Sequence, residues 1–418
     1  MSSGRLQLAS VGLQDFFLTE NPDITYFQKV FKRHTNFTFQ TLDNTFDNNM
    51  GFDTEVSCVI PIKGDLIRNI YLKLELPKLS ESNAVVYTDS IGNAIIEHAD
   101  LIIGGQLIER ITGEYIEIHN QYFTGDSKFK SFEFITGTVD SSNVNDFPSA
   151  NTVQQFIFPL PFYFFRHEPL CIPICALQYQ EVEVRIKLRP LDQLYICPTS
   201  PEDAELANSA KLTNVTLPVE YVYLTDGEVK YFQSRELEYV ITQIQLSTAT
   251  INSSTNTSKF RLNFVNPVKE MFFAIQSSNV IEQNVISGNK LFDYSNPDNS
   301  DNKHHLKSLN LNFNNQTIID EKIADTNFMF ALQPLLYHSR TPKNSSNRLF
   351  YAYSFSLYPE NYSPTGQINM SRIQNKNLKL NLTDSDNERH IKIYAKSYNI
   401  LRIKNNLAGL LFIDNNTV

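Results

Sequence analysis

Two cysteines lie close together in the sequence, and so, farther along the chain, do two histidines; both pairs could suggest metal binding. Three residues separate Cys171 from Cys175, and closely spaced thiolates are common ligands of structural zinc. Such a site needs a second pair of Cys or His ligands nearby, and none follows. His304 and His305 lie in a polar stretch between two lysines, a setting typical of solvated side chains. We therefore predict buried, reduced thiols, solvated histidines and no metal site.

The common catalytic motifs are absent from the sequence. There is no Gly-x-Ser-x-Gly elbow, no glycine-rich phosphate loop ahead of a helix and no His-Glu-x-x-His pattern. The carboxylates are scattered, so no acid–base pair stands out. We predict no catalytic, cofactor-binding or metal-binding residues, and hence a protein that is not an enzyme.

The pair Gly104-Gly105 is better explained by a turn than by phosphate binding. It separates two apolar runs, Leu101–Ile103 and Leu107–Ile111. Glycine supplies the positive φ that both central positions of a two-residue hairpin turn require. Leu311–Ile319 repeats the frame with Asn314-Asn315 at the turn, and Asn is the next best residue at positive φ. The sequence therefore predicts two antiparallel hairpins.

Each hairpin follows a strand-like run that is rich in apolar residues. Ile67–Leu76 precedes the first hairpin and Val268–Ile275 precedes the second. The same order of elements recurs about two hundred residues along the chain. This repeat predicts a duplicated all-β domain.

Further short runs predict the remaining strands. Glu181–Leu188 alternates strictly and is the clearest of them. The others are Val56–Ile62, Phe156–Leu160, Phe162–Phe165, Val215–Leu224, Tyr239–Leu246, Phe260–Phe264, Phe350–Leu357, Leu378–Leu382 and His390–Ile403. Many short strands with few helices predict antiparallel sandwiches or barrels.

Three helices are expected between these strands and ahead of them. Asn21–Arg33 starts with an N-cap candidate and a proline in its first turn. Gly113–Tyr122 reads as a connecting helix and Thr225–Ser234 as a helical connector between domains. The predicted division is an arm over 1–35, a first domain over 36–224, a connector over 225–236 and a second domain over 237–418. The arm helix either caps its own sandwich or docks on a neighbouring subunit.

Composition limits the class of protein. The chain has 418 residues, 30 Phe and 20 Tyr but no Trp, and a formal net charge of −9. Its length suits two or three domains, and its aromatic content favours strands. Without a polybasic tract, nucleic acid and anionic membranes are disfavoured as primary partners.

The four cysteines, which include Cys58 and Cys197, are too few for a disulfide framework. No run reaches the ~18 apolar residues of a membrane helix. We expect a soluble protein made in a reducing cytosol.

Several stretches, from the arm to the last strands, carry one common resemblance. They are Gly12–Pro22, Phe27–Phe37, Ile103–Ile108, Leu177–Val184 and Tyr353–Glu360, with the most specific pair Ser363–Ile373 and Tyr394–Ile403. Taken together, they resemble the double jelly-roll major capsid proteins of nucleocytoplasmic large DNA viruses.

This resemblance implies two eight-stranded jelly rolls side by side, preceded by a short helical arm. It implies homotrimers that form pseudo-hexagonal capsomers and tile the outer icosahedral shell of the virion. Expected partners are the chain itself, neighbouring capsomers, minor capsid proteins and the membrane-associated layer beneath, with no direct nucleic-acid contact. Assembly is expected late in infection, in the host cytoplasm. The arm would then lie at the capsomer base, and Gly137–Asn151, Asp293–His305 and Pro334–Arg348 would supply outward-facing loops or trimer contacts.

Other functions stay open at this stage. Leu407–Phe412 is more apolar and less glycine-rich than the family's tail, so a divergent minor-capsomer paralogue is an alternative to the main capsomer protein. A carbohydrate-binding β-sandwich is a second alternative, although such sites favour exposed Trp and this chain has none. A β-sandwich glycosidase would need a carboxylate pair that the sequence does not reveal.

Overall fold

The structure is a computed structural model that describes residues 2–81, 84–139, 143–253, 255–299, 303–343 and 347–412. It divides into two compact units, Met1–Phe37 and Thr38–Val418.

The first unit is helical, but not where the sequence predicts. Its helices are α1 (Ser3–Ala9) and α2 (Leu13–Thr19), and residues 21–37 contain none. Asn21, the expected N-cap, has a φ of 53°. The helix predicted over Asn21–Arg33 is therefore wrong. Every side chain of that stretch is exposed. A short helix needs its apolar face packed against something, and this exposed stretch has no such cover within its own unit as far as the structure describes it.

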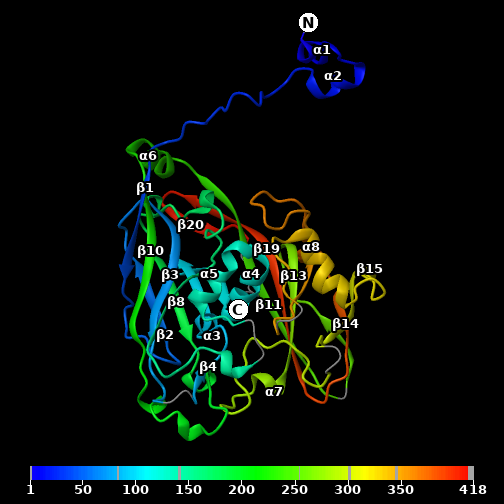
Figure 1. The fold of residues 1–418 in the computed structure, drawn as a ribbon. Coiled ribbons are helices and arrows are strands. Elements are labelled where there is room, and N and C mark those ends of the chain that lie inside the picture. The colour runs from blue at the N-terminus through cyan, green and yellow to red at the C-terminus, as the bar shows by residue number, and fades with distance from the viewer. Residues whose placement is uncertain are drawn as a thin grey trace. The chain divides into compact units, whose positions relative to one another are not determined.

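The second unit contains two β-sandwiches, coloured blue to green and green to red in Figure 1. In the first sandwich one sheet has the order β1-β10-β3-β7 and the other β2-β8-β5-β6. Their bounds are β1 (Thr38–Asn44), β2 (Glu55–Ile60), β3 (Leu66–Leu76), β5 (Ile96–Ile103), β6 (Gln106–Thr112), β7 (Gln154–Pro159), β8 (Val182–Leu188) and β10 (Thr213–Tyr223). A small sheet joins β4 (Val86–Tyr87) and β9 (Tyr195–Ile196).

The second sandwich repeats this strand order. Its sheets run β11-β19-β13-β16 and β12-β18-β14-β15, with β17 added beside β13 and β20 beside β19. The bounds are β11 (Leu237–Ile251), β12 (Thr257–Arg261), β13 (Pro267–Ser277), β14 (Leu306–Phe313), β15 (Gln316–Ile319), β16 (Tyr351–Ser354), β17 (Ile368–Asn369), β18 (Lys376–Leu382), β19 (Arg389–Lys404) and β20 (Leu407–Leu410). Over the described residues each sandwich thus has the two four-stranded sheets of a jelly roll, which confirms the predicted double jelly roll.

Strand alternation builds both cores. In β8 every second side chain is buried, and in β3 the alternating residues Ile70, Leu72 and Leu74 are fully buried. Both predicted hairpins are confirmed. Gly104 and Gly105 turn between β5 and β6 at φ of 57° and 78°, and Asn314-Asn315 turns between β14 and β15 at 50° and 65°.

The turn geometry predicts how position 105 tolerates substitution. A Cβ on Gly105 would meet no atom within 4 Å, so the cost of a side chain there comes from positive φ alone. We expect Gly105→Asn to be nearly neutral, because Asn accepts this region, as it does at position 315. Gly105→Val should lower the free energy of unfolding by about 1–2 kcal/mol. Urea unfolding of the two variants checks this, and equal stabilities would contradict it.

Helices fill the connections between strands. Those of the first sandwich are α3 (Ile91–Ala94), α4 (Gly113–Phe123) and α5 (Asp126–Thr136), and α6 (Asp226–Ser234) follows it. The second sandwich has α7 (Ser278–Ile281), a π-helix (Phe328–Leu332) and α8 (Gln333–Tyr337). Short 3-10 turns occur at Val144–Asp146, Glu168–Leu170, Ile174–Ala176, Leu191–Gln193, Pro201–Asp203, Ala207–Ser209 and Met370–Arg372. The predicted helices at Gly113–Tyr122 and Thr225–Ser234 are confirmed by α4 and α6.

Two local predictions are wrong. Phe162–Phe165 forms a turn rather than a strand, and three of its four rings are buried side by side against the core. An apolar run therefore packs well without joining a sheet. The expected loop Pro334–Arg348 begins inside α8. Parts of the predicted loops at 137–151, 293–305 and 334–348 lie outside the described residues.

The histidine pair is buried, which corrects the prediction that it is solvated. His304 is 8% exposed and its Nδ1 lies 3.2 Å from the Tyr351 hydroxyl, while the fully buried His305 places Nε2 3.1 Å from the Ser295 carbonyl oxygen. Burial, together with the Arg389 charge, lowers the pKa of His305 to about 4. The flanking lysines misled the prediction, because inside the fold the two rings face Tyr351 and Ser295 instead of water.

Neutral burial of His305 makes stability depend on pH. The unfolded chain protonates this imidazole near pH 6.5 and the folded chain only near pH 4, so stability falls as the pH drops between these values. Between pH 7 and pH 5 we expect the protein to lose about 2 kcal/mol more than the His305→Gln variant, whose amide still donates to Ser295. Urea unfolding of both proteins at the two pH values measures this, and an equal loss of stability in both proteins would contradict it.

The cysteines are free thiols. Cys58, Cys171 and Cys197 are buried as predicted, and Cys175 is half-buried. Burial raises the pKa of Cys58 to about 11 and that of Cys171 to about 12, so both stay protonated at neutral pH.

Candidate functional site: the junction between the two sandwiches

The described residues hold no cluster of three or more His, Cys, Asp or Glu side chains that could bind a metal ion. No helix among them is long and apolar enough to cross a membrane. Buried charged groups concentrate instead where the first sandwich meets the second. We take this junction as the candidate functional site.

Helix α4 carries the acidic side of the junction. It begins directly after β6, where the Thr112 hydroxyl accepts a hydrogen bond from the Tyr115 amide at 3.2 Å and caps the helix. Glu114, Glu117 and Gln121 are spaced three and four residues apart and therefore share one face. All three side chains are buried. A helix that turns carboxylates inward needs cationic partners from elsewhere in the fold.

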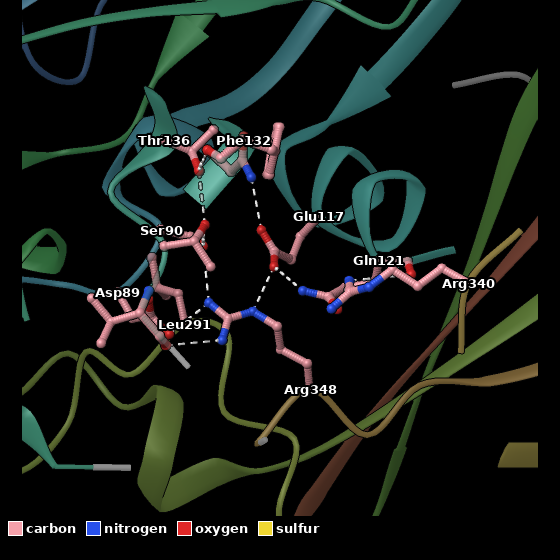
Figure 2. Close-up of polar contacts among 12 residues, drawn as sticks. Asp89, Ser90, Glu117, Gln121, Phe132, Thr136, Leu291, Arg340 and Arg348 are labelled. Atoms are coloured by element: carbon pink, nitrogen blue, oxygen red, sulfur yellow. Dashed lines mark hydrogen bonds and ion pairs between the residues drawn. The ribbon is translucent and has the colours of Figure 1, made fainter. Parts of the chain in front are cut away.

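Arg348 of the second sandwich supplies the central cation (Figure 2). Its Nη2 donates to Asp89 Oδ2 at 2.6 Å and to Ser90 Oγ at 2.9 Å, and its Nε donates to Glu117 Oε1. Glu117 also accepts from Asn93 at 2.7 Å. The Arg348 side chain is 3% exposed and that of Glu117 is fully buried. The guanidinium joins two segments of the first sandwich to the second, and its carboxylate partners raise its pKa against the effect of burial.

Further polar contacts extend the junction along α4. Glu114 contacts Lys392, accepts from the Tyr394 hydroxyl at 2.9 Å and lies 3.6 Å from Arg189. Burial alone would raise the pKa of Glu114, but Lys392 and Arg189 outweigh it and the pKa lies below its usual value. At the other end of the helix, Arg340 donates to Gln121 Oε1 at 2.8 Å.

A second buried group lies under the C-terminal end of α4. Glu270 of β13 pairs with Lys396 of β19 at 2.9 Å and with His338 at 3.1 Å, and all three side chains are at most 1% exposed. Although burial opposes ionisation, Lys396 and His338 hold the pKa of Glu270 well below its usual value. Lys396 also lies 4.1 Å from the ring centroid of Phe123, the last residue of α4.

Neutral contacts close the same junction. The Tyr122 hydroxyl donates to the Phe350 carbonyl oxygen at 2.9 Å, and the Thr88 hydroxyl donates to the Asn289 carbonyl oxygen at 2.7 Å. Asn289 in turn donates to the Tyr195 carbonyl oxygen at 2.9 Å. Backbone acceptors in fixed positions orient one sandwich against the other.

The junction is suited to holding geometry rather than to turning over a substrate. Its carboxylates already bind cations inside the fold, so none is positioned as an acid–base pair over an open cleft. Removal of one partner from such a pair leaves an uncompensated buried charge, which makes the arrangement sensitive to disruption. The sandwiches are thus joined as one block.

The sequence analysis proposed no site residues and missed every member of this junction. Asp89 and Arg348 are 259 residues apart, and no local spacing connects them. The one available signal was the acidic face of Gly113–Phe123, where Glu114 and Glu117 interrupt a helix that is otherwise apolar or uncharged. Buried carboxylates on such a helix indicate cationic partners, but not which ones.

The arm presents a second candidate surface, which is apolar. All of its large hydrophobic side chains are exposed, with Phe17 92% and Phe27 99% accessible. Surfaces of this kind mark binding sites for other proteins.

Comparison with known proteins finds relatives of one kind along nearly the whole chain. Residues 25–225 match the family model described as major capsid protein N-terminus, and residues 228–409 match large eukaryotic DNA virus major capsid protein. The major capsid protein of Pyramimonas orientalis virus is 30% identical over 99% of this chain and all of that relative. The major capsid protein of Paramecium bursaria Chlorella virus 1 is 27% identical, again over 99% of this chain and 100% of the relative.

Solved structures share the fold. The PBCV-1 virus capsid superposes with a TM-score of 0.78 at 24% identity, over 93% of this chain and 100% of that one. The Faustovirus major capsid protein superposes with a TM-score of 0.73 at 12% identity, over 94% of both chains. At these sequence identities the structural matches support the double-sandwich fold and nothing more.

Proposed function

Because this chain belongs to the family of large eukaryotic DNA virus major capsid proteins, we propose that three copies of it form one capsomer of the virion shell. The protein is a structural component of that shell, which lies outside the genome. Two similar sandwiches per chain, taken three times, present six similar walls, so a three-fold trimer approximates a hexagon and can tile a surface.

The observation that carries this proposal is the buried junction. A hexagonal tile needs its two walls per chain at a constant angle, because a flexible pair would not pack into a regular lattice. The Arg348 and Glu114 ion pairs and the backbone contacts of Tyr122 and Asn289 connect the sandwiches at fixed positions. We assign them the role of setting that angle.

Several finer points belong to the proposal. We divide the chain into an arm over 1–35, a first jelly roll over 36–224, a connector over 225–236 and a second jelly roll over 237–418. The arm would contact neighbouring capsomers, minor capsid proteins or the membrane-associated layer beneath the shell. The loops over 137–151, 293–305 and 334–348 would face outward or form trimer contacts. Assembly would take place in the host cytoplasm, with no catalytic step and no contact to nucleic acid.

Electron microscopy of the purified protein tests the proposal. Negatively stained particles of the full-length chain should average to a three-fold object with a hexagonal outline. Particles that average to a single pair of sandwiches, at concentrations where other capsid proteins associate, would contradict it. A protein that stays in this state but binds glycans specifically would favour the carbohydrate-binding alternative.

A further inference from the structure

A cavity of about 640 Å³ opens in the first sandwich beside the C-terminal end of α4 and the start of α5. One part of its wall is apolar, formed by Phe132, Ile135, Phe165 and two prolines. The other part carries polar and cationic groups. Those groups come from His119, Asn120, Ser127, Lys128, Arg166 and His167. The two kinds of wall suit a ligand that is apolar at one side and anionic at the other.

Two buried side chains in this wall leave a hydrogen-bond donor unused. His119 is 4% exposed and Asn120 is 5% exposed, and His119 Nδ1 lies 3.3 Å from Asn120 Oδ1. Neither Asn120 Nδ2 nor His119 Nε2 has a partner among the described residues. If the Asn120 amide is turned by 180°, its nitrogen donates to His119 Nδ1, and Nε2–H becomes the free donor instead. Either arrangement therefore leaves one N–H without an acceptor among the described residues.

The charge around these donors is positive. Arg166 lies 4.4 Å from the Phe123 ring centroid and donates to the Tyr115 hydroxyl at 3.1 Å, but no carboxylate within the described residues lies at ion-pair distance from it. Lys128 stands in the first turn of α5, where the free amides and the helix dipole also favour an anion. Among the described lining residues Glu360 is the one carboxylate, and it already accepts from the Ser339 amide at 2.6 Å.

The cavity lies close to the place where the arm leaves the sandwich. His167 lines the cavity, and the next residue, Glu168, pairs with Arg68 at 3.3 Å. Arg68 in turn lies 5.7 Å from the ring centroid of Phe39, in the strand that follows the arm. Copies packed side by side in a shell, with the same ends aligned, would bring the arm of one copy close to the cavity of the next.

The arm carries acidic and aromatic side chains that complement the cavity. Segment Leu13–Phe27 contains three acidic residues, Asp15, Glu20 and Asp23, and no basic residue. Phe16, Phe17, Tyr26 and Phe27 are interleaved with them, and all are exposed in the single chain. Its charge and its aromatic side chains both complement the cavity.

We propose that this cavity receives the acidic, aromatic segment Leu13–Phe27 of a second copy of the chain. A carboxylate of the segment binds at the end that carries Arg166 and Lys128, and aromatic side chains cover Phe132 and Phe165. This inference rests on the proposed function, since it requires that copies associate, and it deepens that function by naming one contact.

Photo-crosslinking of the full-length protein tests the inference. A photoreactive p-benzoylphenylalanine replaces Phe17, and the native mass of each sample is measured before irradiation. Irradiation should give a covalent dimer on a denaturing gel, with the crosslinked peptide mapped by mass spectrometry to residues 119–135 or 159–167. Lys128→Glu should lower the dimer yield roughly three- to tenfold, because it replaces attraction by repulsion.

Lys130→Glu is the matched control, because Lys130 is exposed on the same helix but does not line the cavity. An equal loss of yield with both variants would overturn the inference. So would crosslinks confined to one chain, crosslinks that map elsewhere, or no covalent dimer in a sample whose native mass is that of a trimer. In each of those results the trimer itself would stand. A sample that does not associate at all would overturn the inference and the proposed function together.

Discussion

Replacement of Arg348 by methionine should lower the free energy of unfolding by about 3–5 kcal/mol. The substitution keeps most of the side-chain volume but leaves the buried carboxylates of Asp89 and Glu117 without their shared cation. It also removes the donor to Ser90. Because these groups lie in the first sandwich and Arg348 in the second, the substitution weakens the contact between the two sandwiches. Urea unfolding followed by circular dichroism measures the change.

Arg402→Met is the matched control for this variant. Arg402 donates from Nε and Nη2 to one oxygen of Glu238, Oε1, at 2.9 and 2.6 Å, but both side chains are more than a third exposed. Water already solvates these charges, so the expected loss is at most about 1 kcal/mol. Equal losses for the two variants would mean that Arg348 contributes no more than a surface ion pair, against the role that we give the junction.

Glu270→Gln should have a comparable effect, again about 3–5 kcal/mol. The amide retains the shape of the side chain, but the Lys396 ammonium stays buried without a carboxylate, and His338 loses its charged acceptor. Glu321→Gln is the control, since its partner Lys379 lies at 2.6 Å on the surface. We expect the control to lose much less stability, because water screens this exposed pair.

The Glu270 variant should also change the response to acid. A carboxylate whose pKa is lowered by folding stabilises the protein above its unfolded pKa of about 4.5, and that stability is lost as the pH falls below this value. The difference in stability between the natural protein and Glu270→Gln should therefore shrink below pH 4.5. A difference that stays constant down to pH 3 would contradict the assignment of an ionised Glu270.

Strand alternation and turn chemistry made much of the fold predictable. The runs at Ile67–Leu76 and Glu181–Leu188 and the Gly104-Gly105 turn report local rules, in which period and positive φ decide the outcome. The repeat of the hairpin at Asn314-Asn315 extended those rules to a duplicated domain, and the resemblance to a capsid family named its topology.

What failed were features that depend on tertiary context. Asn21–Arg33 has good helix signals, yet nothing packs against its apolar face, and α2 forms upstream instead. His304 and His305 have polar neighbours in sequence, but in space His304 lies against Phe330 and Tyr351, and His305 contacts the Ser295 carbonyl oxygen. The junction depends on pairs such as Asp89 with Arg348, which no local pattern brings together.

The native mass of the protein in solution tests the central claim most directly. Light scattering on the full-length chain, and on a chain without residues 1–33, separates assembly by the sandwiches from assembly by the arm. We predict a trimer near three times 48.0 kDa for the full-length chain. A trimer that survives truncation would show that the sandwiches hold the three copies together without the arm. A monomer in both samples at high concentration would contradict the capsomer account.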